Sequence, residues 1–199
     1  MHKLYSFDLD DNLVTTDSCI RTDKGRIPTR EYAAVRGTVR LAEDAFAELR
    51  KVDCCTLAAA PCLSVLERAV EDGSPIAVVT ARDNSATEMR RLLGRALAEL
   101  GKVKLPEGDG VRFYCCNSKE FLEAFGAEGK SIEERKCLAL KDFLTHHPDA
   151  TSIGFSDDDE ANLRTAGAFF ESLGAQRPEL KCALYEATPD GRVKRRELG

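Results

Sequence analysis

The stretch Leu4-Tyr5-Ser6-Phe7-Asp8-Leu9-Asp10-Asp11-Asn12 decides the fold, because a short apolar run passes directly into a string of acids. Similar short apolar runs recur along the chain, at Ile76–Val79, Val111–Cys116, Ser152–Phe155 and Cys182–Tyr185. Continuously apolar runs of this length are typical of strands that are buried on both faces of a parallel sheet. We therefore expect strands at Leu4–Phe7 and at the four later runs.

Amphipathic segments separate these runs. Ser85-Ala-Thr-Glu88 and Ser131-Ile-Glu-Glu134 are capping boxes, and each predicts the start of a helix. Two more helices are expected, one around Leu163–Leu173 and one from Pro61 to about Gly73. Alternating strands and helices predict a Rossmann-like, doubly wound α/β sheet, folded as a single domain over residues 1–199.

Residues 15–58 interrupt this alternation, since they form a longer connection than usual. Asp23-Lys-Gly25 reads as a turn, with Ser18–Thr22 and Arg26–Thr29 as the arms of a hairpin. Residues 38–50 follow helical spacing. We interpret 15–58 as a small flap or cap inserted after the first strand, over the edge of the sheet where a site is expected. An irregular crossover without a role is the alternative.

Composition excludes several classes of protein. The 199 residues are 43% hydrophobic and 32% charged, which is typical of a globular chain. A net charge of −5 argues against general adhesion to nucleic acid or anionic lipid, and leaves a local basic groove open. The eight cysteines lack zinc-site spacing, and we expect Cys115, Cys116, Cys137 and Cys182 to be small buried hydrophobes. Without a signal-peptide pattern or a membrane-length apolar stretch, we expect a cytoplasmic protein with no membrane partner.

Polar residues follow three of the expected strands. They are Asp8, Asp10 and Asp11 after the first strand, Thr80-Ala81-Arg82 after the second, and Asp157-Asp158-Asp159 after the fourth. The carboxyl ends of parallel strands share one edge, so these groups are expected to converge there. Crowded carboxylates need a cation, and an oxygen-only ligand set favours Mg²⁺.

A lysine is also expected at this edge. Lys136 lies four residues after Ile132 and four before Leu140, on the apolar stripe of its helix. A lysine in that position either snorkels outward or points at acidic groups. Lys130 competes with it, but precedes the capping box in an expected loop.

These residue types suggest phosphoryl transfer. A carboxylate such as Asp8 can attack phosphorus, and Asp10 can protonate the leaving oxygen and later activate water. The Thr80 hydroxyl and the backbone N–H groups of the following loop, at Ala81, can bind phosphoryl oxygens. Arg82 is interpreted as a loop residue or a salt-bridge partner.

The order of these segments resembles the haloacid dehalogenase (HAD) superfamily. Phe7-Asp8-Leu9-Asp10-Asp11-Asn12-Leu13 is similar to its first motif, and Val78-Val79-Thr80-Ala81-Arg82 to its second. The segment Lys136-Cys-Leu-Ala-Leu-Lys-Asp-Phe-Leu144 is similar to the helix that carries its motif-three lysine, and Gly154-Phe-Ser-Asp157-Asp158 resembles its fourth motif. The resemblance covers residues 3 to about 170. It departs from many members at Asp11-Asn12.

The resemblance implies specific roles. Asp8 becomes the nucleophile and a metal ligand, and Asp10 becomes the acid/base and a ligand through its backbone carbonyl. Thr80 and Lys136 become phosphate binders, while Asp157 binds the metal with Asp158 in support. The run Asp157-Asp158-Asp159 leaves the metal ligand open by one position.

The sequence therefore predicts a Mg²⁺-dependent phosphatase of the HAD type that acts on a phosphomonoester. A phosphotransferase using the same intermediate is one alternative, and a non-catalytic binding module of this fold is another. The expected partner is a phosphorylated substrate, either a small molecule or an exposed phosphate on a macromolecule. Nucleic acid enters only as a substrate.

Overall fold

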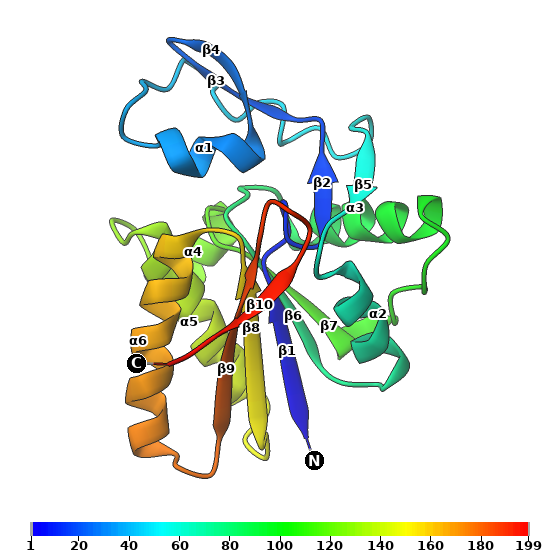
Figure 1. Cartoon of the computed structure of the whole chain (residues 1–199), viewed down its shortest axis with the longest axis vertical. Coiled ribbons are helices and arrows are strands. Elements are labelled where there is room, and N and C mark those ends of the chain that lie inside the picture. The colour runs from blue at the N-terminus through cyan, green and yellow to red at the C-terminus, as the bar shows by residue number, and fades with distance from the viewer. Residues whose placement is uncertain (1, 199) are drawn as a thin grey trace.

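A six-stranded sheet forms the centre of the molecule in the computed structural model, which describes residues 2–198 apart from the side chain of residue 33 (Figure 1). The strands are β1 (Lys3–Phe7), β6 (Ile76–Thr80), β7 (Val111–Cys115), β8 (Ser152–Asp157), β9 (Lys181–Ala187) and β10 (Val193–Arg196). Their order is β10-β9-β8-β1-β6-β7. All neighbours pair in parallel except β9 and β10, which are antiparallel. The five predicted strands and the parallel α/β architecture are confirmed.

The winding of the sheet reverses beside β1. The chain moves from β1 to β6 and β7 on one side, and then crosses to β8 and β9 on the other. Such a reversal opens a crevice at the carboxyl ends of the two central strands, and ligands of open α/β sheets bind there. The crevice lies between β1 and β8, the strands that precede Asp8 and Asp158.

Helices cover the sheet in two layers. The first layer is α2 (Leu63–Glu71) and α3 (Ala86–Glu99), which share a core with β1, β6 and β7. The second layer is α4 (Lys119–Phe125), α5 (Ile132–Thr145) and α6 (Glu160–Gln176), which share a core with β8 and β9. Both predicted capping boxes are present, at Ser85 and Ser131. No pattern in the sequence predicted α4. A short 3-10 turn, η1 (Gly108–Gly110), precedes β7.

The segment 15–58 stands above the carboxyl ends of the strands, at the top of Figure 1. It contains the end of β2 (Val14–Thr16), then β3 (Cys19–Thr22), β4 (Gly25–Pro28), α1 (Thr29–Val35) and β5 (Leu57–Ala59). β3 and β4 form an antiparallel hairpin, as predicted, and β2 pairs with β5 to connect the insertion to the core.

The predicted helix over residues 38–50 is wrong, because this segment consists of turns and isolated bridges. Its backbone groups bond to the hairpin instead: the Arg40 N–H donates to Asp23, and the Ala42 N–H donates to the Arg21 carbonyl. Asp44 has a φ of 53°, which a continuous right-handed helix does not allow. Tertiary hydrogen bonds therefore override the helical spacing.

One further expectation concerns the burial of cysteines. Cys115 and Cys116 are buried as predicted, while Cys137 and Cys182 are only partly buried. The basic segment near the C-terminus forms the edge strand β10. Within residues 2–198, no helix is both long enough and apolar enough to cross a membrane.

Candidate active site

The parallel register brings the ends of β1, β6 and β8 to one point. The backbone N–H of Asp8 donates to the Ser156 carbonyl at 2.8 Å, so the chain leaves β1 in register with β8. Thr80 ends β6 and Asp157 ends β8. The sheet therefore places Asp8, Thr80 and Asp157 around one cavity of about 490 Å³, as the sequence predicted.

Lys136 joins two of these acids. Its Nζ donates to Asp8 Oδ1 and to Asp157 Oδ2, both at 2.7 Å, and the residue is only 3% exposed. Burial opposes the charged lysine, but the two carboxylates outweigh it and raise the pKa of Lys136. Lys130, the competing lysine, is exposed. Of the two orientations considered for Lys136, the structure has the one that points at the acidic groups.

The third carboxylate of the group belongs to Asp158. One oxygen from each of Asp8, Asp157 and Asp158 lies within 4.8 Å of the others. Burial is the main reason that the pKa of Asp8 is raised, with neighbouring carboxylates adding to it and Lys136 opposing it. Burial, followed by the charge of Asp157, raises the pKa of Asp158 to about 8. Burial is therefore the main cause of both shifts, and the Lys136 ammonium opposes both.

The three consecutive acids at the end of β8, Asp157 to Asp159, have different contacts. Asp157 Oδ1 accepts from the Asp159 N–H at 2.9 Å and from Asn162 Nδ2 at 3.1 Å, which fixes its carboxylate toward Lys136. The Asp159 side chain caps α6 by accepting from the Ala161 N–H at 2.8 Å. Asp157 and Asp158 therefore belong to the carboxylate group, and Asp159 to the helix start.

The donor set fits a small divalent cation. When all three carboxylates are ionised, a single ammonium leaves two negative charges in a largely buried space, and a bound cation would favour that ionised form. The available ligands are oxygens only, which suits a hard cation better than a metal that prefers thiolate or imidazole ligands. Asp8, Asp157 and Asp158 are the residues that could hold such an ion.

Asp10 does not join this group with its side chain. Arg82 binds its carboxylate with both prongs of the guanidinium, Nη2 to Oδ1 at 2.6 Å and Nε to Oδ2 at 2.9 Å. The Arg82 side chain is 2% exposed, and its remaining nitrogen donates to the Leu49 carbonyl in the insertion. The expectation that Arg82 forms a salt bridge is confirmed, but the sequence did not indicate that Asp10 is the acid it binds.

The loop after β6 completes the floor of the cavity. Thr80 is 1% exposed, and its hydroxyl oxygen accepts from the Arg82 N–H at 3.2 Å. The Ala81 carbonyl accepts from Asn117 Nδ2 at 2.6 Å. Thr80 and Ala81 both line the cavity beside Lys136, in the positions from which phosphate contacts were predicted.

Asn12 connects the loop after β1 to the neighbouring strand. It is fully buried and its Oδ1 accepts from the Ser156 hydroxyl at 2.9 Å, which ties the loop after β1 to β8. The preceding Asp11 has a φ of 57°, a left-handed conformation that Asp adopts more readily than most residues. Its carboxylate accepts from Thr29 of the insertion at 2.7 Å.

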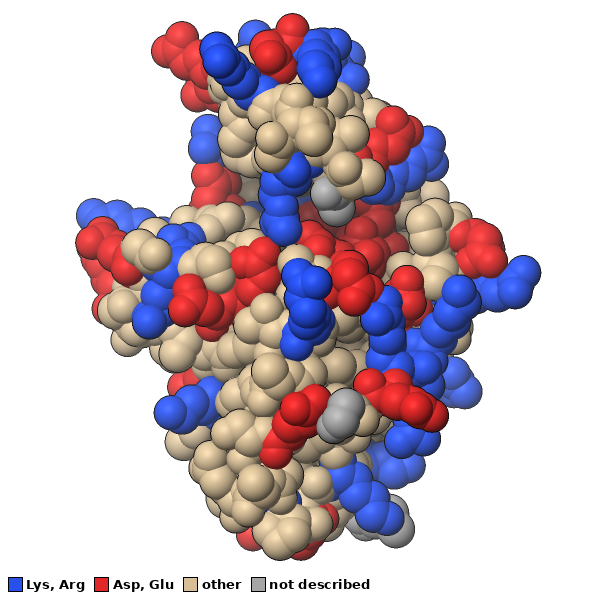
Figure 2. Space-filling view, turned by 60° about the vertical axis from the view of Figure 1, so that its left-hand side comes forward, with Lys and Arg blue, Asp and Glu red and all other residues tan. Residues whose placement is uncertain are grey.

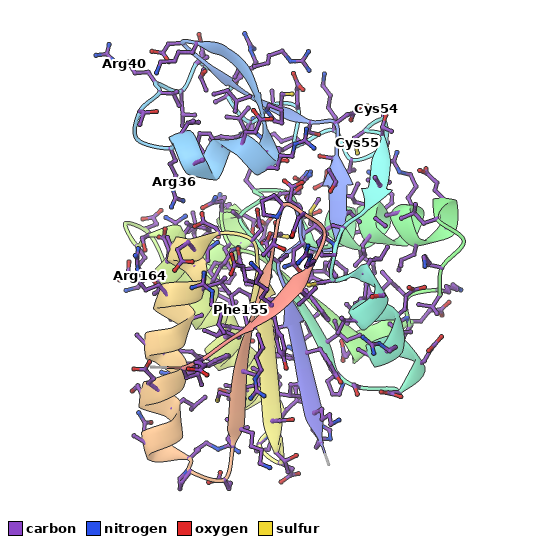
Figure 3. The ribbon with its side chains drawn as sticks, in the orientation of Figure 1. Arg36, Arg40, Cys54, Cys55, Phe155 and Arg164 are labelled. Atoms are coloured by element: carbon purple, nitrogen blue, oxygen red, sulfur yellow. The ribbon has the colours of Figure 1, made fainter. Side chains whose placement is uncertain are left out.

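The insertion forms the opposite wall of the cavity. Ile20, Tyr32, Phe46 and Leu49 give it an apolar surface, on which Tyr32 and Phe46 meet edge to face with ring centroids 6.2 Å apart. Arg36 extends from α1 toward the core (Figure 3), where it pairs with Glu133 at 3.2 Å and Asp159 at 3.5 Å. Figure 2 shows acidic side chains gathered in the hollow beneath the insertion. The sequence offered no signal for Tyr32 or Arg36, since neither belongs to a motif.

No family model, curated protein or solved structure matches this chain.

The Lys136 bridge predicts a large effect on stability. We expect Lys136→Met to lower the free energy of unfolding of the metal-free protein by about 3–5 kcal/mol, because it leaves buried carboxylates without a partner. Urea unfolding measures this change. Lys130→Met is the control and should stay within about 0.5 kcal/mol of the original protein, as exposed substitutions usually do. A change below about 1 kcal/mol for Lys136→Met would contradict the bridge as a major stabilising contact.

The raised carboxylate pKa values predict how stability depends on pH. The pKa of Asp158 is about 8 in the fold against an ordinary 3.8, so its contribution is present below 3.8 and is lost as pH rises through 8. We therefore expect metal-free protein to become less stable from about pH 5 to about pH 8, by at most about 1.4 kcal/mol per pH unit for each proton. Urea unfolding across this range measures the slope. Asp158→Asn should reduce it, and stability that rises with pH would contradict the raised pKa.

Proposed function

We propose that this protein is a Mg²⁺-dependent phosphatase that hydrolyses a phosphomonoester through an aspartyl phosphate on Asp8. The observation that carries the proposal is the buried contact of Lys136 Nζ with Asp8 and Asp157, both at 2.7 Å, at the switch point of a parallel sheet. The resemblance of four ordered motifs to the HAD superfamily supports the same reaction. This arrangement supplies a nucleophile, a cation and a cation-binding carboxylate pair in one cavity.

The first half of the reaction transfers the phosphoryl group to Asp8. Lys136 holds Oδ1 of this carboxylate, which leaves Oδ2 to attack phosphorus. The P–O bond to the alcohol breaks, and Asp10, which enters this step in its protonated form, donates that proton to the departing oxygen. Lys136 has three N–H donors, of which two bind carboxylates and the third remains for a phosphoryl oxygen. Thr80 and the loop at Ala81 bind the other phosphoryl oxygens.

The second half regenerates the enzyme. Asp10 removes a proton from water, the water oxygen attacks phosphorus, and the bond between phosphorus and Asp8 breaks to release inorganic phosphate. A bound Mg²⁺ supplies positive charge that lets the anionic substrate approach Asp8 and that stabilises the charge developing on the phosphoryl oxygens. Asp8, Asp157 and Asp158 are the residues that would hold it.

The apolar wall formed by the insertion affects which phosphomonoesters the cavity would accept. Tyr32, Phe46 and Leu49 present apolar surface to a cavity whose floor is charged. A phosphate bound at the floor would direct its ester group toward this wall. Among phosphomonoesters, those whose alcohol carries aromatic or apolar surface are therefore favoured over small polyols.

Phosphate release tests the proposal. We expect the protein to release phosphate from a panel containing p-nitrophenyl phosphate, nucleotides, sugar phosphates, phosphopeptides and phosphorylated oligonucleotides, with Mg²⁺ and not with EDTA. Asp8→Asn should lower the rate by at least about a thousandfold, because the attacking atom is lost. Asp83→Asn is the matched control, since Asp83 lines the same cavity but pairs with Arg50 at its rim.

The outcomes separate the alternatives. Release that is unchanged in Asp8→Asn would contradict the proposed nucleophile. Phosphate that appears on an added alcohol instead of in solution would favour the phosphotransferase. Folded protein that binds Mg²⁺ and releases nothing from the panel would favour a binding module.

The Arg82–Asp10 contact predicts a dependence on the leaving group. We expect Arg82→Lys to lower kcat about a hundredfold for glycerol phosphate, because lysine lacks the two-pronged fork that orients Asp10 toward the leaving oxygen. For p-nitrophenyl phosphate, whose product leaves without a proton, the loss should be less than about tenfold. Arg50→Lys, at the rim, is the control. Equal losses on both substrates would show that Arg82 does not act through Asp10.

A further inference from the structure

One face of β8 and β9 lies open. On one side these strands pack against α6, while α2 and α3 contact β6 and β7 on the opposite side of the sheet. In Figure 1 no helix lies in front of β8 and β9, and only β10 with the chain that follows it crosses in front of their upper part. A groove of about 590 Å³ runs over this face, away from the cavity that contains Asp8.

The strand register defines what this face presents. Lys3, Ser152 and Lys181 are neighbours across β1, β8 and β9, and they form a row at the amino ends of the strands. Phe7, Ser156 and Tyr185 form a second row, which Arg195 of β10 extends. Tyr5 and Gly154 lie between the two rows. Alternation along a strand places all of these side chains on the same face.

The middle of the groove is aromatic. A Cβ on Gly154 would lie 3.2 Å from the Tyr185 ring, so the glycine is what lets this ring rest on the backbone of β8. Beside Gly154, the Tyr5 ring lies nearly parallel to that of Phe7, with an interplanar angle of 9°. The two tyrosines are partly exposed and line the groove. They give it flat surfaces of the kind on which bases stack.

The border of the groove is positively charged. Its exposed charged residues are Lys3, Arg68, Lys181 and Arg195, and no Asp or Glu lines it. Over residues 2–198, none of these four side chains forms an ion pair. Figure 2 shows Lys and Arg side chains concentrated along the right-hand side of the lower half, the side to which this face turns. In a chain of net charge −5, such a local excess is a specific feature of this surface.

We propose that this groove binds single-stranded nucleic acid. Four cations that form no ion pair and share the groove with no acid complement a phosphate backbone, and two partly exposed tyrosines between them complement unpaired bases. An acidic peptide would use the cations and leave the tyrosines without planar partners. The surface lies apart from the cavity with Asp8, and the proposal does not depend on the phosphatase activity.

Fluorescence anisotropy with a fluorescein-labelled single-stranded oligonucleotide that lacks a terminal phosphate tests this proposal. We expect binding, and a plot of log K against log salt concentration should have a slope of about −2.8, as four phosphate contacts on a single strand produce. The double variant Lys181→Ala/Arg195→Ala should weaken binding at least tenfold at about 50 mM salt and make the slope shallower by about 1.4. Lys104→Ala/Lys119→Ala is the matched control: it removes the same charge from residues that pair with Glu107 and Glu123 elsewhere.

The tyrosine variants separate nucleic acid from other polyanions. Tyr185→Leu should weaken binding about tenfold without changing the salt slope, because it removes a stacking surface and no charge. Tyr185→Phe keeps the ring and should bind normally, which also checks that packing on Gly154 is intact. Absence of binding at low salt, or equal losses in the matched control, would overturn the proposal. Displacement by heparin together with unchanged binding in Tyr185→Leu would replace it with a general polyanion surface.

Discussion

The buried ammonium of Lys136, held between Asp8 and Asp157, is the contact on which the rest of the site depends. A lysine that is 3% exposed is tolerable only when carboxylates surround it, and two ionised carboxylates at the same depth need that lysine. The contact joins residues 128 and 21 positions apart, from α5 to the ends of β1 and β8. Because Asp158 adds a third carboxylate, the lysine cannot neutralise the group alone when all three are ionised, and the three acids are placed so that they could hold a cation.

A second buried cation connects the site to the insertion. Arg82 follows β6, binds both oxygens of Asp10 and donates to the Leu49 carbonyl. Thr29 of the insertion bonds to Asp11, and Arg36 reaches Glu133 and Asp159 on the far side of the cavity. The insertion is therefore attached to the acidic loop at several points, so a change in its position would be felt at Asp10 and Asp11.

Local sequence patterns predicted two kinds of element well: strands that are buried on both faces, and helices whose first backbone N–H groups bond to a nearby capping residue. The apolar runs became β1, β6, β7, β8 and β9, and both capping boxes begin helices. The same reasoning failed for residues 38–50, where Asp23 and Arg21 bond to the backbone and prevent a helix. It also missed α4, whose seven residues are too few to show a clear helical period.

The sequence by itself determined the parallel sheet and the convergence of Asp8, Thr80, Lys136 and Asp157. The carboxyl ends of parallel strands share one edge, and helical spacing places Lys136 on the apolar stripe of its helix, regardless of what the insertion does. Only the tertiary structure decided that Arg82 binds Asp10, that Tyr32 and Phe46 face the carboxylates, and that β8 and β9 expose a basic, aromatic face. These features arise between residues far apart in the chain, on surfaces that no periodic pattern encodes. Which residues meet at these places depends on how the strands, helices and insertion pack in three dimensions.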